Sequence, residues 1–370
     1  FMVQRDYLHA LWMWYHINFD MITAEKMDVN YKTFSGLKKI IKLYAKGVLD
    51  GGIDVTKLEQ TMQQYINLNK FYHSPIKYGL VTVNLTTLKP VELKKEDIPK
   101  DKLKDYLMAS ATCFPAFKKK KIGDQDFVDG GYYDNLPIHL AIELGATEVI
   151  AVDLKAIGVK KKVKEDIPIT YIRPRTDIGS FLIFDKELSR RAMRLGYLDT
   201  LKTFHKLEGN IFTFRNGELD KNKRKYKDIM IRRMKEIFHL DTGGTMKELF
   251  MVSKYRAFFQ DTKRVGNEMN EILEYLGRAF ELSDTRIYTL SSFQREIKKR
   301  MKYLEPFEFS QLEEKWKNKN LKNIRYSKTI LQYLVQKIEQ QDNKNHTEFM
   351  MLAMLFPKDM LAAIYMTLLS

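Results

Sequence analysis

The stretch Asp126–Leu154, DFVDGGYYDNLPIHLAIELGATEVIAVDL, decides the fold that we predict for this chain. A short extended segment leads to Asp129, and a double glycine follows it, a combination typical of a tight backbone turn. Pro137 suits the first turn of a helix, and Gly145 is placed to end that helix. The stretch therefore predicts a strand, a turn that presents an acidic side chain, a helix and a second strand.

The segments around this stretch predict an α/β fold for residues 1–205. Downstream, TEVIAVDL (Thr147–Leu154) and IPITYIRP (Ile167–Pro174) are apolar runs typical of fully buried strands in a parallel sheet covered on both faces. Upstream, residues 76–93 are rich in β-branched side chains and contain a Thr-Thr-Leu-Lys turn, which indicates two paired strands. A helix is expected next, ending before Pro115.

Helices are predicted at both ends of the chain. Residues 3–49 have apolar side chains at helical spacing, and residues 206–370 are charged, helical in pattern and poor in strands. We therefore expect an all-helical C-terminal domain over 206–370. Its last apolar segment, Phe349–Ser370, is divided near Pro357 into two short pieces, which we interpret as two core helices, with an interfacial membrane helix as the alternative.

Composition narrows the class of protein. The 370 residues include 63 Lys and Arg against 47 Asp and Glu, a net charge of +16, which favours anionic partners. The excess is spread over both parts of the chain, so no nucleic-acid module is expected. Cys113 is the one cysteine, which excludes an internal disulfide framework and suits a cytoplasmic location. The seven histidines have no metal-ligand spacing, and no apolar run is long enough to span a bilayer.

Two interpretations of Asp129 follow from its local pattern. In the first, its carboxylate accepts hydrogen bonds from backbone amides of its own turn, as Asp commonly does. The second Asp-Gly-Gly in the chain, at Asp50, looks like such a loop residue. In the other interpretation, the turn holds the carboxylate at the end of the sheet as a general base. Because a free Asp has a pKa near ~3.9, that role needs desolvation or a preorganised partner.

Several blocks, in order, are similar to those of a known family. VDGGYYDNLP (Val128–Pro137) resembles the second signature of the patatin-like phospholipases, an Asp-Gly-Gly followed by an Asn-x-Pro helix start. ASATCFPAF before it, and ELGATEVIAVDL, ITYIRPRTDIGSFLIFD and LGYLDTLK after it, are similar to further blocks of bacterial members. The resemblance covers residues 1–205. It implies a three-layer domain with a mostly parallel central sheet and a Ser-Asp catalytic dyad.

The sequence departs from the family at the nucleophile. A G-x-S-x-G elbow is found nowhere in the 370 residues, and Ser35, Ser110 and Ser180 lack the flanking glycines of such an elbow. We assign none of them as nucleophile. In the family, a segment like FMVQRDYLHALWMWYHI (residues 1–17) closely follows the elbow helix. The resemblance therefore leads us to expect the first strand, the oxyanion loop and the serine upstream of Phe1.

The implied activity is a lipid acyl hydrolase that acts on phospholipids or other lipid esters without a metal or cofactor. Asp129 would be the general base, Gly130 and Gly131 would allow close approach to the serine, and Asn135 and Pro137 would fix the helix behind the turn. A Ser-Asp dyad has no need of the nearby His139, for which we expect a structural role.

Partners and alternatives follow from charge and from the missing serine. The lysine run 118–121 is interpreted either as a contact with anionic membrane surfaces or as a solvated loop. The alternative to an enzyme is an inactive patatin-like scaffold that binds lipid or protein. A basic nucleic-acid-binding protein ranks last, because its binding would require a concentrated basic surface.

Overall fold

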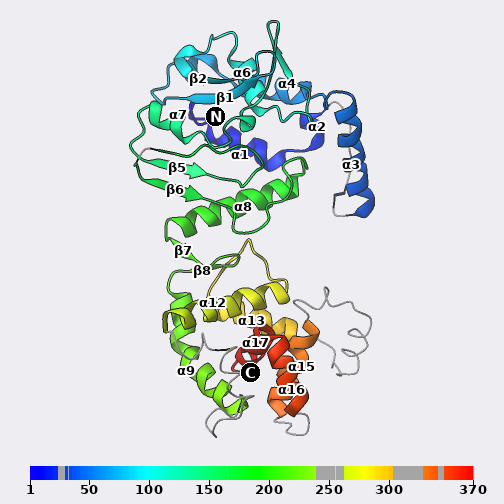
Figure 1. The fold of residues 1–370 in the computed structure, drawn as a ribbon, viewed down its shortest axis with the longest axis vertical. Helices are drawn as coiled ribbons and strands as arrows, with labels where there is room; N and C mark the ends of the chain where they lie inside the picture. Colours follow the sequence, from blue (N-terminus) through cyan, green and yellow to red (C-terminus); the bar gives the residue numbers. More distant parts are fainter. Residues whose placement is uncertain are drawn as a thin grey trace. The chain divides into compact units, whose positions relative to one another are not determined.

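The computed structural model describes residues 1–23, 30–31, 33–164, 166–238, 255, 262–302, 328–340 and 346–369. The first part of the chain combines helices with strands, and helices dominate the second (Figure 1). The chain divides into two compact units, Phe1–Thr200 and Leu201–Ser370, called here the first and the second unit.

Helices open the first unit, as the spacing of apolar residues predicts. Residues 3–49 form three of them, and others lie between and after the strands. The helices are α1 (Tyr7–His16), α2 (Phe19–Ile22), α3 (Phe34–Leu49), α4 (Thr56–Tyr65), α5 (Leu68–Tyr72), α6 (Leu103–Ala111), α7 (Ile138–Glu143) and α8 (Lys186–Thr203), with short 3-10 turns η1 (Lys95–Asp97) and η2 (Gly130–Tyr132).

The main sheet of the first unit is antiparallel. Its strands, in the order β2-β1-β4-β3, are β1 (Gly79–Asn84), β2 (Lys89–Lys94), β3 (Lys120–Ile122) and β4 (Gln125–Asp129). The predicted hairpin is confirmed: the side-chain oxygen of Asn84 accepts hydrogen bonds from the amides of Thr86 and Thr87 and so closes the turn. Leu103 of α6 is fully buried, and Tyr106 of the same helix meets Phe127 edge to face with centroids 5.8 Å apart.

The expectation of a mostly parallel central sheet is wrong for the described part of this unit. Only β5 (Val149–Val152) and β6 (Ile169–Ile172) pair in parallel, as a separate two-stranded sheet. The other four strands include two tight hairpins, and a short hairpin can join only antiparallel neighbours. The expectation that β5 and β6 are fully buried is also wrong, because Ile150 and Val152 of β5 are 59% and 57% exposed.

The second unit is a helical bundle with a small sheet. Its helices are α9 (Glu218–Phe238), α12 (Thr262–Ala279), α13 (Leu290–Met301), α15 (Lys328–Gln340), α16 (His346–Leu355) and α17 (Pro357–Thr367). The predicted pair of C-terminal core helices is confirmed by α16 and α17, and α17 is buried from Asp359 to Met366. The expectation of an all-helical region over 206–370 is wrong at three short strands, β7 (Leu207–Glu208), β8 (Thr213–Arg215) and β9 (Ile287–Tyr288). They were missed because segments of two or three residues carry no periodic signal.

Helix length also bears on membrane insertion. Among the described residues, no helix is both long enough and apolar enough to cross a bilayer.

Candidate active site

Asp129 lies where β4 ends and η2 begins. It is opposite Thr82 of β1 in the sheet register, and its backbone amide donates to the carbonyl of Thr112, with an N···O distance of 2.9 Å. Its side-chain Oδ1 accepts a hydrogen bond from the amide of Gly131, at 2.6 Å. The turn interaction of the first interpretation is therefore present, and it uses one of the two carboxylate oxygens.

The two glycines after Asp129 are required by close approach and not by backbone conformation. Neither has a positive φ. A Cβ atom at the buried Gly130 would lie 2.4 Å from the carbonyl oxygen of Val81 in β1, a contact that backbone atoms cannot relieve cheaply. A Cβ at Gly131 would lie 3.0 Å from Asp129 Oδ1 and 3.1 Å from Asn135 Oδ1. The expected intolerance of side chains in this turn thus has a steric cause.

Burial makes the carboxylate of Asp129 more basic. Desolvation raises its pKa above the usual range, and the hydrogen bond from Gly131 partly opposes the rise. Burial also raises the pKa of Cys113 and of Tyr132, and the charge on Asp129 adds to both effects. The three side chains therefore share one partly buried environment. A carboxylate with a raised pKa is a better proton acceptor near neutral pH than a free one.

A loop packs directly behind the turn. The amide of Val159 donates to the carbonyl of Gly131 at 3.0 Å, and the amide of Asn135 donates to the carbonyl of Val159 at 2.6 Å. Gly158 has a φ of +155°, and a Cβ there would lie 2.8 Å from the Gly131 oxygen. Pro137 is the N-cap residue of α7. Asn135 and Pro137 thus lie next to the Asp129 turn, and the supporting role that the resemblance implies for them stays a prediction.

One acidic side chain fastens both ends of that loop. Asp153, just after β5, is buried, with Oδ1 2.6 Å from Lys160 Nζ and Oδ2 3.1 Å from Arg173 Nε. Its Oδ1 also accepts from the amide of Lys155. The hydrogen bond from Lys160, with help from the other donors, lowers the pKa of Asp153 to about 2. We did not single out Asp153 from the sequence; the signal was an Asp placed directly after an apolar strand.

His139 has the structural surroundings that we expected. Its Nε2 lies 2.7 Å from Glu92 Oε1 on β2, and its Nδ1 lies 3.0 Å from the buried Asp134 Oδ2. The imidazole therefore lies between the edge strand β2 and the segment that follows the Asp129 turn.

The three serines considered from the sequence do not pair with Asp129 in the described part of the chain. The hydroxyl of Ser110 donates to the carbonyl of Val81 at 2.8 Å, so it serves to join α6 to β1. Ser35 lies exposed on α3, and Ser180 lies exposed in the loop before α8. No group of three or more potential metal ligands occurs among the described residues.

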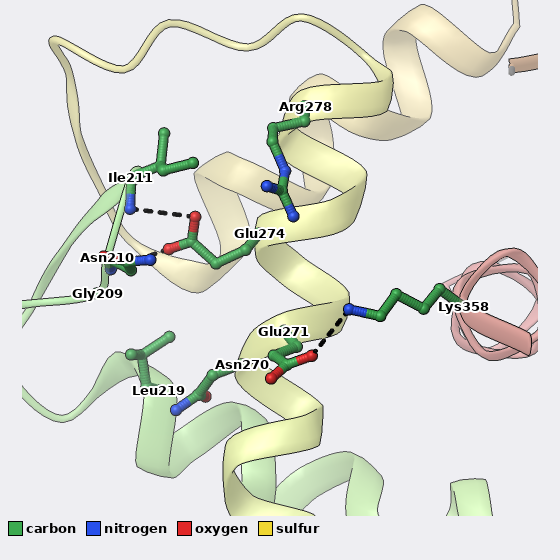
Figure 2. Close-up of a pocket in the computed structure, with 9 residues that line it drawn as sticks. All are labelled: Gly209, Asn210, Ile211, Leu219, Asn270, Glu271, Glu274, Arg278 and Lys358. Atoms are coloured by element: carbon green, nitrogen blue, oxygen red, sulfur yellow. Dashed lines mark hydrogen bonds and ion pairs between the residues drawn. The ribbon is translucent and has the colours of Figure 1, made fainter. Parts of the chain in front are cut away.

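A separate cavity of about 460 Å³ lies in the second unit (Figure 2). Glu274 of α12 dominates it: its carboxylate accepts from the amides of Asn210, Ile211 and Phe212 at 2.9, 3.2 and 3.4 Å. Lys358 and Glu271 form an ion pair at 3.3 Å across another part of its wall. Because Glu274 already occupies the amides that could hold an anion, we assign this cavity no catalytic role.

Comparison with known proteins shows that Asp129 lies within a region that matches a protein family. The family Patatin-like phospholipase matches residues 9–142, a range that begins within α1, includes α2 to β4 and ends within α7. Residues 9–142 therefore carry a patatin-like phospholipase domain, and the match suggests a lipid acyl hydrolase. No curated protein and no solved structure matches the chain.

Proposed function

We propose that the protein is a lipid acyl hydrolase of the bacterial patatin-like type, with Asp129 as the general base of a Ser-Asp dyad. The observation that carries the proposal is the position of Asp129: inside the matched region, at the end of a strand, on a glycine turn that presses against β1. Its substrates would be phospholipids or other lipid esters, and its location cytoplasmic.

The nucleophile in this proposal is a serine upstream of Phe1. The sequence contains no G-x-S-x-G, and the Ser110 hydroxyl is bonded to the backbone of β1. Ile150 and Val152 of β5 leave an apolar face exposed, of the kind that another segment of an α/β domain covers. The alternative, an inactive scaffold, requires that no such serine precedes Phe1.

The chemistry follows from the two oxygens of Asp129. Among the described residues, Oδ1 is held by the Gly131 amide, and Oδ2 makes no hydrogen bond. Oδ2 would take the proton from the serine hydroxyl as the serine oxygen attacks the ester carbonyl, and would return it to the leaving alcohol. A water molecule, deprotonated by the same oxygen, would then release the fatty acid and regenerate the serine.

The test is hydrolysis of short-chain p-nitrophenyl esters by the protein together with its native upstream residues. We expect Asp129→Asn to reduce kcat by ~10³-fold or more, because Asn cannot accept the serine proton. Asp50→Asn is the matched control, since Asp50 follows α3 in the other Asp-Gly-Gly, and it should leave the rate unchanged. Wild-type turnover by Asp129→Asn would refute the dyad, and an upstream sequence without an elbow serine would favour the scaffold.

A further inference from the structure

Helix α3 (Phe34–Leu49), drawn in blue in Figure 1, carries a stripe of exposed apolar side chains. Phe34, Leu37, Ile41 and Val48 are all exposed, at 86%, 40%, 61% and 45%. Their spacings of three, four and seven residues place them on one side of the helix. Exposed aliphatic and aromatic side chains gathered on one helix face mark an interaction surface more than chance scatter does.

A row of lysines runs beside this stripe. Lys38, Lys42 and Lys46 follow one another at four-residue intervals, and Lys39 adds a fourth positive charge. The helix contains no acidic residue. Within the described part of the chain, none of these four lysines forms an ion pair. Their charges are therefore available to an external anionic partner.

Another face of α3 packs into the core. Ile40 and Leu43 are buried in a cluster with Phe19, Ile53 and Phe117. Gly47 lies so close to this cluster that a Cβ would be 2.5 Å from Ile53 Cγ1. The outer stripe is thus a different side of α3 from the one that packs on this cluster, and it is exposed in the described part of the chain.

We propose that α3 docks the protein in the plane of an anionic phospholipid surface. The apolar stripe would enter the boundary between headgroups and acyl chains, while the lysine row would lie against the phosphate groups. A nucleic acid would use the lysines and leave the apolar stripe in water. The combination of the two rows on one helix therefore favours a lipid surface.

This assignment differs from the one that charge alone suggested. In the lysine run 118–121, Lys118 pairs with Asp54 at 3.5 Å, and Lys119 pairs with Asp126 at 2.5 Å. Lys120 bonds to two further carboxylates. Most of that run is neutralised within the molecule, so it is a poorer membrane contact than α3.

Docking through α3 would also bear on the candidate active site. Cys113 packs against the cluster under α3 and lies within electrostatic reach of Asp129. The cluster under α3 and the Asp129 turn therefore have Cys113 as a common neighbour. The inference nevertheless goes beyond the proposed function, because binding a lipid surface requires no hydrolysis.

The experiment measures binding of the 370-residue chain to vesicles by flotation. One set of vesicles is phosphatidylcholine, and the other contains about a third phosphatidylserine. We expect binding to the anionic set only, weakening as salt is raised. Leu37→Asp with Ile41→Asp, and separately Lys38→Glu with Lys42→Glu, should each weaken it by ~10-fold or more. All four side chains are exposed, so these variants should fold.

Matched controls lie on α9. Ile229→Asp replaces an isoleucine that is 43% exposed, close to the 40% of Leu37, and Lys221→Glu with Arg224→Glu reverses two exposed charges. These controls should bind as the wild type does, as should Asp129→Asn, whose loss of hydrolysis would concern the dyad alone. Unchanged binding by both α3 variants would overturn the proposal. The proposal would also be overturned if the wild-type chain did not bind anionic vesicles. It would be overturned as well if the α3 variants lost self-association or binding to a protein but still bound the vesicles.

Discussion

Asp129 in the first unit and Glu274 in the second are both acidic side chains that accept backbone amides, but they differ in how many. Glu274 is almost fully buried and accepts from three consecutive amides. Asp129 is partly buried and accepts from one. Burial raises the pKa of both carboxyls, and the amide bonds oppose the rise in each. The pKa direction alone therefore does not separate them.

The difference teaches that free acceptor capacity, and not the pKa, distinguishes a candidate base from a structural carboxylate. The oxygens of Glu274 are both used, so its removal would leave buried donors without partners. Asp129 keeps Oδ2 available for a proton in the described structure. A carboxylate that is consumed by its own loop stabilises that loop, whereas one held by a single oxygen can also react.

The largest expected effect separates the two carboxylates by stability. Glu274→Ala should reduce the stability of the second unit by about 4 kcal/mol, because each buried amide left unpaired costs about 1–3 kcal/mol. Asp129→Asn should change that of the first unit by under about 1 kcal/mol, since the Asn oxygen can still accept from Gly131. Native-state hydrogen exchange of amides in each unit measures both quantities. Equal losses of stability in the two variants would show that the number of accepted amides does not distinguish the two carboxylates.

Asp359 in α17 sharpens the point that a raised pKa does not by itself mark a catalytic group. It is buried in the second unit, where the Tyr275 hydroxyl donates to it, and desolvation raises its pKa from 3.8 to about 6. The unfolded chain ionises first as pH rises from about 4 to 6, so stability falls across that window and stays reduced above it. The full difference corresponds to roughly 3 kcal/mol.

Asp359→Asn should therefore stabilise the second unit by roughly 3 kcal/mol at neutral pH and by almost nothing near pH 3.5. Urea denaturation of the wild type and the variant at both pH values measures this. A variant that is less stable than the wild type at neutral pH would show that the ionised carboxylate is needed in the core. Ester hydrolysis should be unaffected.

The smallest effect concerns the loop that supports the Asp129 turn. Asp153→Asn should destabilise the first unit by about 1 kcal/mol at neutral pH, because the solvent-exposed cations of Lys160 and Arg173 lose their charged partner. The pKa of Asp153 is depressed to about 2, so the stabilisation is present above about pH 4 and is lost as pH falls toward 2.

The measurement is hydrogen exchange of the Val159 and Asn135 amides, which join this loop to the turn. Faster exchange in the variant, with unchanged exchange in the second unit, is the expected result. Unchanged protection of Val159 would show that Asp153 does not hold the loop. Asp177→Asn, in an exposed loop, is a control that should leave both amides as they are.

Much of the local structure could be predicted because it depends on short-range patterns. The hairpin at residues 76–93, the helix after Pro137 and the two C-terminal helices each follow from side-chain spacing and from turn or helix-ending residues nearby. The candidate site was also found locally, since Asp129 and its glycines are adjacent in the sequence. Its role as base stays a prediction, as does the division into a patatin-like and a helical domain.

The errors concern relations between distant segments. Strand direction in the main sheet depends on which strands pair, and the pairing of β1 with β4 joins residues more than forty positions apart. The lysine run looked available until its partners Asp54, Glu59 and Asp105 came together around it in the fold. The exposure of the outer face of α3 depends on which face of the helix packs against the core.

The sequence by itself determined the hairpin at residues 76–93, the helix after Pro137 and the two C-terminal helices, because the signals for each lie within a few residues of each other. It also determined that an acid stands on a double-glycine turn in a patatin-like block. Only the tertiary structure decided that Gly130 faces the Val81 carbonyl, that Asp129 has an oxygen without a donor among the described residues, and that both oxygens of Glu274 accept amides. The physical reason is that hydrogen-bond satisfaction and desolvation depend on atoms brought together from remote parts of the chain.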